Sequence, residues 1–434
     1  WLDATTSGST FSASGVTLSS GTHTLSVQTV DAAGNLVAGT GNTYTLDTTV
    51  PTALATVTAL SADTGSSSTD FVTGTAAQTV SGTFTGTLGT GEKIQVSADG
   101  GAHWLDATTS GSTFSASGVT LLSGAHTLSV QTVDAAGNFV AGTGNTYTLD
   151  KTAAVINSYS LSIDSGTGVA SLNVNANETS SAQLLDSSGN PLSGISSKQL
   201  SAGVFGGITL APQTADATIA HLVVTDTAGN VTNSPSNIVL GSSTSFTIGG
   251  TTFDGNDTFN GVGNNDLVVG FGGMNTITGG AGADTIIGGS EGFNTFVYTD
   301  LSGSLAGTGV LTAGDTLLDF HASTDSLQVS SVVYNKLQSG DPAAFLEYTS
   351  DPSLSTVATG NLAHDISTIL NAGSVTFEAN GVAEISITSG GGAYSGEAGQ
   401  YVVINHGAQG YDPAQDAVIL IGSGHLPSID QFTA

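Results

Sequence analysis

Cysteine and arginine are absent from the 434 residues, and the only basic side chains besides histidine are 4 lysines, against 34 aspartates and glutamates. Without cysteine, the chain can form no disulfide, no thiolate metal site and no cysteine nucleophile. The formal net charge of -30 makes nucleic acid and anionic membranes poor partners. Carboxylates repel one another unless they are widely spread or hold a cation. Stability must therefore come from packing and from oxygen-ligated ions.

Long apolar runs and catalytic signatures are also missing. No stretch approaches the roughly 20 apolar residues of a membrane span, and no basic segment followed by an apolar one begins the chain. The 8 histidines form no HExxH pair, and nothing else in the sequence indicates a catalytic group. We therefore expect no membrane span, no catalytic residue and no enzymatic activity, and any export must use a route other than a cleaved N-terminal signal.

Two stretches of the chain repeat one another. A repeat at the spacing of a small domain indicates a tandem array. Within each copy, polar and apolar residues alternate over short runs separated by Gly, Asn and Asp, a pattern typical of half-buried strands in a β-sandwich. Trp1 matches Trp104 in the middle of a repeat, so we expect the first copy to be incomplete. Residues 1–49 and 104–152 differ only at Ser19/Leu122, Thr22/Ala125, Leu36/Phe139 and Thr48/Lys151.

Short motifs recur at fixed places in the array. Asp31-Ala-Ala-Gly34-Asn35 recurs in the second copy and returns in divergent form as Asp226-Thr-Ala-Gly229-Asn230. Asp47-Thr-Thr-Val-Pro51 joins one copy to the next. These motifs resemble those of the bacterial Ig-like repeats of large surface adhesins. The resemblance implies a partial Ig-like domain at 1–47, a complete one at 48–150 and a divergent one at 151–242.

Glycine-rich repeats of nine residues give the sharpest signal, over residues 253–298. They fit G-G-x-G-x-D-x-U-x, in which U is apolar. The pattern predicts a parallel β-roll, in which each repeat supplies a turn and a short strand. Glycine turns bring carbonyl oxygens close together, so these oxygens and the sixth-position side chains can enclose Ca²⁺, which takes about six to eight oxygen ligands. The expected ligands are Asp257, Asp266, Asn275, Asp284 and Asn294, with Gly255, Gly273 and Gly282 in the turns.

This repeat resembles the RTX, or haemolysin-type, calcium-binding repeat of proteins exported by type I secretion machinery. Asn275 and Asn294 depart from the aspartate of that family. Residues 315–329 look like the segment that follows the roll, which adds Asp315, Asp319 and Asp325 to the expected metal ligands. The resemblance implies an RTX roll at 243–300 and a β-rich C-terminal domain with a type I secretion signal at 301–434. The expected fold is therefore all-β: tandem Ig-like β-sandwiches, a parallel β-roll and a β-rich end.

Aspartates of the tandem array form a second candidate set of calcium ligands. A cation between modules would clamp one module to the next and stiffen the array. Aspartate is also a favoured turn residue in any sandwich, so a purely structural role is equally open. The residues concerned are Asp47, Asp63, Asp70, Asp134, Asp150 and Asp164.

These features together indicate an extracellular, calcium-dependent structural or adhesive protein. Its place would be the cell surface or biofilm matrix of a Gram-negative bacterium, and its partners would be copies of itself or other surface components. A self-assembling S-layer or extracellular filament subunit is the alternative, and the C-terminal part of a secreted hydrolase is a third possibility. Ca²⁺ is the one cofactor that the sequence indicates.

Overall fold

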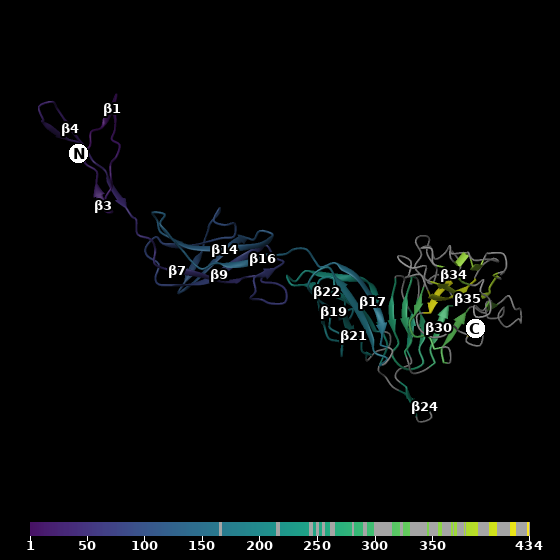
Figure 1. Ribbon diagram of the computed structural model, residues 1–434. Coiled ribbons are helices and arrows are strands. Elements are labelled where there is room, and N and C mark those ends of the chain that lie inside the picture. The colour runs from purple at the N-terminus through teal and green to yellow at the C-terminus, as the bar shows by residue number, and fades with distance from the viewer. Residues whose placement is uncertain are drawn as a thin grey trace. The chain divides into compact units, whose positions relative to one another are not determined.

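The regular structure of the computed structural model consists almost wholly of β-strands, which confirms the all-β fold class (Figure 1). The chain divides into two compact units, unit 1 (Trp1–Thr152) and unit 2 (Ala153–Ala434). The described part of the chain contains no apolar helix of membrane-spanning length. The structure describes residues 1–164, 167–213, 218–242, 246–248, 251–253, 257–260, 265–279, 282–289, 293–298, 315–321, 324–329, 345–346, 355–357, 366–367, 369–370, 377, 379–388, 399–405, 417–421 and 432–433.

Residues 1–47 form three separate antiparallel strand pairs. Phe11 is 60% exposed, whereas its equivalent in the second copy, Phe114, is 2% exposed. In the described structure, the repeated sequence is therefore packed into a core only in its second copy. The pairs are β1 (Thr5–Ser7) with β2 (Thr10–Ser12), β3 (Gly21–Thr24) with β6 (Thr43–Leu46), and β4 (Gln28–Val30) with β5 (Leu36–Ala38).

The rest of unit 1 is a sandwich of two sheets. Alternate residues of its strands are buried, as period-two sequence predicts. Val80, Ile94 and Leu128 are 0% exposed and belong to one core. One sheet has the order β12 (Thr108–Ser110), β13 (Thr113–Thr120), β9 (Ala77–Thr85), β7 (Leu54–Leu60); the other has the order β11 (Leu105–Asp106), β10 (Lys93–Ser97), β14 (Gly124–Val133), β16 (Asn145–Leu149), β8 (Val72–Thr73), with β15 (Phe139–Ala141) paired to β14.

Unit 2 begins with two more sheets that share one core. Leu172, Leu184 and Leu222 are at most 1% exposed and join them. The first sheet contains β17 (Ile156–Ile163), β18 (Ala170–Ala176) and β21 (Gly206–Thr209). The second sheet begins with β20 (Lys198–Leu200), β19 (Ser180–Leu185), β22 (Thr218–Asp226) and β23 (Val231–Leu240).

The second sheet continues without a break into a stack of parallel strands. Ile238, Val239 and Leu240 of β23 pair in parallel with residues 267–269. The predicted boundary at 242/243 therefore lies between two strands of one sheet, and the five predicted domains stay predictions. The sheet runs on in parallel through β27 (Leu267–Val269), β29 (Thr285–Ile287), β31 (Thr316–Leu317) and β37 (Ala417–Ile421). It continues antiparallel through β36 (Gly399–Ile404) and β35 (Val382–Thr388), and β33 (Phe345–Leu346) and β34 (Ser355–Val357) both pair in parallel with β35.

A second parallel sheet faces it across a shared apolar core. Phe259, Ile277 and Phe296 come from this sheet, and Val268 and Ile286 come from the other; all are at most 1% exposed and lie in one cluster. These five residues occupy the apolar position of the nine-residue repeat. The sheet has the order β26 (Thr258–Asn260), β28 (Thr276–Thr278), β30 (Thr295–Tyr298), β32 (Ser326–Val329), β38 (Phe432–Thr433), and a separate hairpin joins β24 (Phe246–Ile248) to β25 (Thr251–Phe253).

Candidate metal centre

The parallel stack arranges its buried polar residues in two columns. Successive repeats place their strands in alternate sheets, so the residue just before each strand stacks on the residue before the next strand of the same sheet. Every member of both columns is at most 2% exposed. We name them the aspartate column, which contains Asp266, Asp284 and Asp315, and the asparagine column, which contains Asp257, Asn275, Asn294 and Asp325.

Side-chain oxygens hold each column together by accepting backbone N–H groups of the preceding member. In the aspartate column, Asp266 N–H donates to Oδ1 of Asp284 at 2.8 Å, and Asp284 N–H donates to Oδ1 of Asp315 at 3.0 Å. In the asparagine column, three such bonds measure 3.0, 3.2 and 3.0 Å. The members that these bonds join are 18 to 31 residues apart in the chain. One oxygen of each accepting member is therefore fixed by the backbone.

Asp284 is the member of the aspartate column whose electrostatics the structure describes in detail. Its Oδ2 atom is buried and has no hydrogen-bond partner. Burial, and then the nearby carboxylates of Asp315 and Asp266, raise the pKa of Asp284 to about 8, although the N–H of Asp266 opposes this rise. A buried carboxylate without compensation stays ionised only at a high cost in free energy, unless a cation lies beside it.

Two carboxylate oxygens converge beside Gly279, which directly follows β28. A methyl group at Gly279 would collide with Oδ2 of Asp284 and lie 3.0 Å from Oδ2 of Asp315. Burial, and then Asp315, raise the pKa of Tyr298 well above its ordinary value, so its phenol stays neutral beside these acids. Buried carboxylates that converge on a glycine fit Ca²⁺, a hard cation that prefers oxygen ligands. Asp266, Asp284 and Asp315 are the side chains that would hold it.

The carboxylates at the two ends of the asparagine column are bonded to backbone N–H groups. Oδ2 of Asp257 accepts the N–H of Ser242 at 2.7 Å. Oδ1 of Asp325 accepts the N–H of Asn294 at 3.0 Å, and its Oδ2 accepts the N–H of His321 at 2.9 Å. Burial, and to a smaller extent Asp319, raise the pKa of Asp325 above its usual 3.8, and these two N–H groups offset only part of the rise. Peptide N–H groups therefore bond one oxygen of Asp257 and both oxygens of Asp325.

Asp319 and the turn glycines support the stack from outside the columns. Asp319 accepts the N–H of Gly288 at 2.7 Å and that of Gly289 at 2.8 Å, one on each oxygen, and so fixes the chain after β29. Gly273 and Gly282 have φ values of 93° and 141°, where a side chain would be strained. The predicted ligand Gly255 lies outside the described residues.

Most aspartates of the tandem array accept N–H groups of their own turns. Oδ1 of Asp47, Asp70 and Asp150 accepts the N–H two residues later, at 2.9, 3.0 and 2.9 Å. Oδ1 of Asp164 accepts both the N–H and the hydroxyl of Thr167 at 2.8 Å. Each residue thus has a role in shaping a turn. A metal-binding role for them stays a prediction.

Asp134 and Asp63 differ in how fully their oxygens are used. Oδ1 of Asp134 accepts the N–H of Asn138 at 2.8 Å, and its Oδ2 accepts the side-chain amide of the same residue at 2.8 Å. Oδ2 of Asp63 accepts the N–H of Phe71 at 3.0 Å, whereas its Oδ1 is buried without a hydrogen-bond partner. Burial, and to a smaller extent Asp70, raise the pKa of Asp63. Asp63 therefore has a buried oxygen that is not used by its own turn, and a metal-binding role for it stays a prediction.

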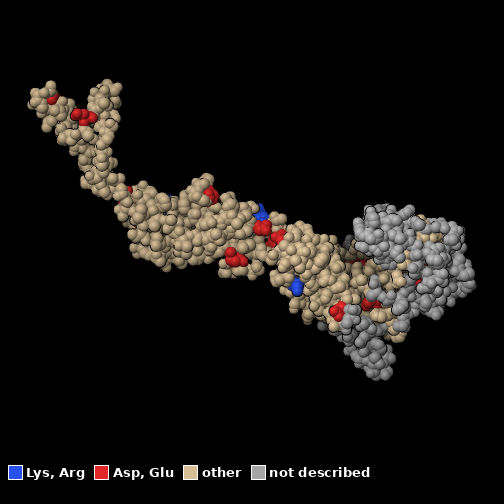
Figure 2. Space-filling model, viewed as in Figure 1, with Lys and Arg blue, Asp and Glu red and all other residues tan. Residues whose placement is uncertain are grey.

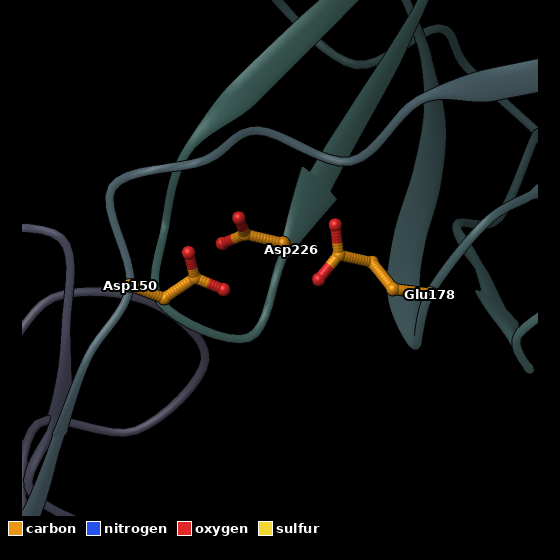
Figure 3. A group of neighbouring side chains, drawn as sticks. All are labelled: Asp150, Glu178 and Asp226. Carbon is orange, nitrogen blue, oxygen red and sulfur yellow. The ribbon is translucent and has the colours of Figure 1, made fainter. Parts of the chain in front are cut away.

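On the face drawn in Figure 2, the acidic side chains of unit 1 lie in small separate groups. In unit 2, Glu178 and Asp226 each place one oxygen within 4.8 Å of the other (Figure 3). The sequence motif places Asp226 only in a turn and gives no signal for Glu178, because no spacing links two residues so far apart in the chain. Asp150, also drawn there, belongs to unit 1. Two carboxylates carry fewer oxygens than the roughly six to eight that Ca²⁺ takes, so an ion here would need further ligands.

Comparisons with known proteins show only distant similarity. No family model matches the sequence, and no curated protein matches it. A solved biofilm-associated protein BSP domain is similar to 40% of this chain and to 28% of its own, at 19% identity and a TM-score of 0.16. Dimeric latent PorU from Porphyromonas gingivalis is similar to 43% of this chain and to 20% of its own, at 13% identity and a TM-score of 0.17. Similarities this low carry no functional conclusion.

Proposed function

We propose that this chain is a calcium-dependent extracellular protein of a bacterial surface or biofilm matrix, with a structural or adhesive role and no catalytic activity. The observation that carries the proposal is the aspartate column, in which three stacked and buried carboxylates include an oxygen without a hydrogen-bond partner. Calcium is the abundant cation whose preferred ligands match this set. The resemblance of the repeats to RTX sequences supports the same conclusion.

Calcium would act on folding through the aspartate column. In its absence, repulsion between Asp266, Asp284 and Asp315 opposes stacking of the turns. When the ion binds only to the folded stack, its binding free energy adds to the free energy of folding. Type I export fits this scheme, because the chain would stay unfolded where calcium is scarce and fold where calcium is plentiful. The stack would then order only outside the cell.

The proposal is tested by circular dichroism of the full chain in chelator and in millimolar Ca²⁺. We expect β-structure and the midpoint of thermal unfolding to rise with calcium and to fall again when chelator is added. Millimolar Mg²⁺ is the control, because that ion needs near-ideal octahedral geometry and loses its water reluctantly. Identical spectra and midpoints in chelator and calcium would contradict the proposal.

Electron microscopy in calcium would separate the adhesive from the self-assembling form of this function. Isolated particles support an adhesin or matrix component, whose partners are other molecules. Ordered lattices or fibres support an S-layer or filament subunit, whose partner is a second copy of the chain. Either result leaves calcium dependence to be decided by the spectroscopic test.

A further inference from the structure

The asparagine column fills the space between its turns with amide groups. The side-chain nitrogen Nδ2 of Asn275 is surrounded by oxygens of three carbonyl groups and one neighbouring amide. An amide NH₂ group has two hydrogens to donate and carries partial positive charge. Its two hydrogens can each bond to one of these oxygens, and its partial positive charge attracts the others, which would otherwise repel one another. The acceptors are the carbonyls of Gly288 at 2.9 Å, Gly272 at 3.2 Å and Gly270 at 3.5 Å, and Oδ1 of Asn294 at 3.1 Å.

Asn294 repeats this arrangement one step further along the column. Its Nδ2 donates to the carbonyl of Gly289 at 3.2 Å and to Oδ1 of Asp325 at 3.2 Å. Its Oδ1 accepts the N–H of Asn275, so each part of the amide has a partner. Both asparagines are 1% exposed. Buried polar side chains that are fully bonded rigidify a structure at little cost in free energy.

The order of charges also distinguishes the two columns. In the aspartate column, every neighbouring pair consists of two carboxylates. In the asparagine column, Asn275 and Asn294 stand between Asp257 and Asp325, so no two neighbouring members are both acids. Repulsion between adjacent members is thus confined to the aspartate column.

We infer that the asparagine column closes without calcium, because the amide N–H groups of Asn275 and Asn294 occupy the place among the oxygens that a cation takes in the aspartate column. This inference rests on the proposed calcium binding by the aspartate column and adds to it which edge of the stack needs the ion. One edge of the stack is calcium-dependent, and the other is built to form in the ion's absence.

The test exchanges the side chains of the two columns in the full chain. The double variant Asn275→Asp with Asn294→Asp is dialysed against millimolar Ca²⁺, and bound calcium per chain is counted by atomic emission. We expect the double variant to bind at least one more ion per chain than the wild type. We also expect its unfolding midpoint in chelator to fall, because adjacent carboxylates then line both columns.

The matched control is Asp284→Asn, which places the same amide in the aspartate column. It is expected to bind at least one ion fewer, and its unfolding midpoint in chelator is expected to rise. Calorimetric titration separates the rival explanation, in which wild-type Asn275 and Asn294 already bind calcium through Oδ1. In that case the double variant would bind the same number of ions more tightly, and that result would overturn the inference.

Failure of the proposed function gives a different pattern. If neither the wild type nor any variant binds calcium, the calcium function is wrong. Even then, a lower unfolding midpoint of the double variant in chelator would support the inference that amide groups close the asparagine column, because that measurement involves no ion. An unchanged midpoint in chelator would overturn closure by amides, provided that the far-ultraviolet spectrum shows the variant to be folded.

Discussion

Single aspartates fix the D-x-x-G-N turns of this chain. In the turn of residues 186–190, Oδ1 of Asp186 accepts the N–H groups of Ser188 and Asn190, both at 2.8 Å, and Gly189 has a φ of 82°. The N–H of Asn190 is the main cause that lowers the pKa of Asp186 below its usual 3.8. A carboxyl group whose pKa is lowered by folding stabilises the fold above its unfolded pKa and loses this effect as the pH falls. The same turn begins at Asp31, Asp134 and Asp226.

Substitution of Asp186 by Asn keeps the acceptor Oδ1 and removes the charge. We expect Asp186→Asn to lower the midpoint of thermal unfolding at neutral pH. This difference from wild type should shrink as the pH falls below 3.8, where the unfolded aspartate is protonated, and vanish below the lowered pKa of the folded aspartate. Asp186→Ala, which also loses the acceptor, should unfold at a lower temperature at every pH. A difference between wild type and Asp186→Asn that is the same at pH 3 and pH 7 would contradict this account.

At the scale of the element, the nine-residue period predicts structure within the stack and gives no information on the strands outside it. It predicted the buried apolar residues, such as Phe259 and Ile277, because one strand and one turn fill each repeat. It could not show that Asp284 bonds to Asp315, because the residues between them do not keep the period. The parallel pairing of β23 with β27 could not be predicted either, because the alternation of polar and apolar residues in a strand does not specify which strand it pairs with. The two columns differ chemically because successive strands lie in alternate sheets, so that every second repeat contributes to the same column. This alternation is a property of the folded stack.

Substitution of the glycines beside the two columns would distinguish an ion site from an amide-filled site. Gly279→Ala would place a methyl group against Oδ2 of Asp284, and overpacking of this kind costs roughly 1–3 kcal/mol, so calcium affinity should fall about tenfold. Gly270→Ala would place a methyl group 2.5 Å from the carbonyl of Gly288 and 2.6 Å from Nδ2 of Asn275.

The second variant is expected to lower the unfolding midpoint equally in chelator and in calcium, with its calcium affinity unchanged. Calorimetric titration and thermal unfolding of both variants provide the measurements. Equal losses of affinity in the two variants would mean that both columns hold ions.

At the scale of the whole molecule, calcium should stabilise the two units unequally. Unit 1 contains a separate core around Leu128, which is 0% exposed, whereas unit 2 contains the aspartate column. An ion at a concentration of about 100 times its dissociation constant stabilises the folded state by about 2.7 kcal/mol. Scanning calorimetry of the full chain should therefore show a transition that calcium moves to higher temperature and another that it leaves in place.

Two variants assign these transitions to the units. Leu128→Ala removes core volume at a cost of roughly 2–5 kcal/mol and should lower only the calcium-insensitive transition. Asp284→Asn should abolish the response of the calcium-sensitive transition to calcium. If calcium instead raises the transition that Leu128→Ala lowers, then ions also bind in the tandem array. Asp63, with its buried and unpartnered Oδ1, is the residue at which that binding should be lost, so Asp63→Asn would then remove the response of unit 1 and leave that of the stack.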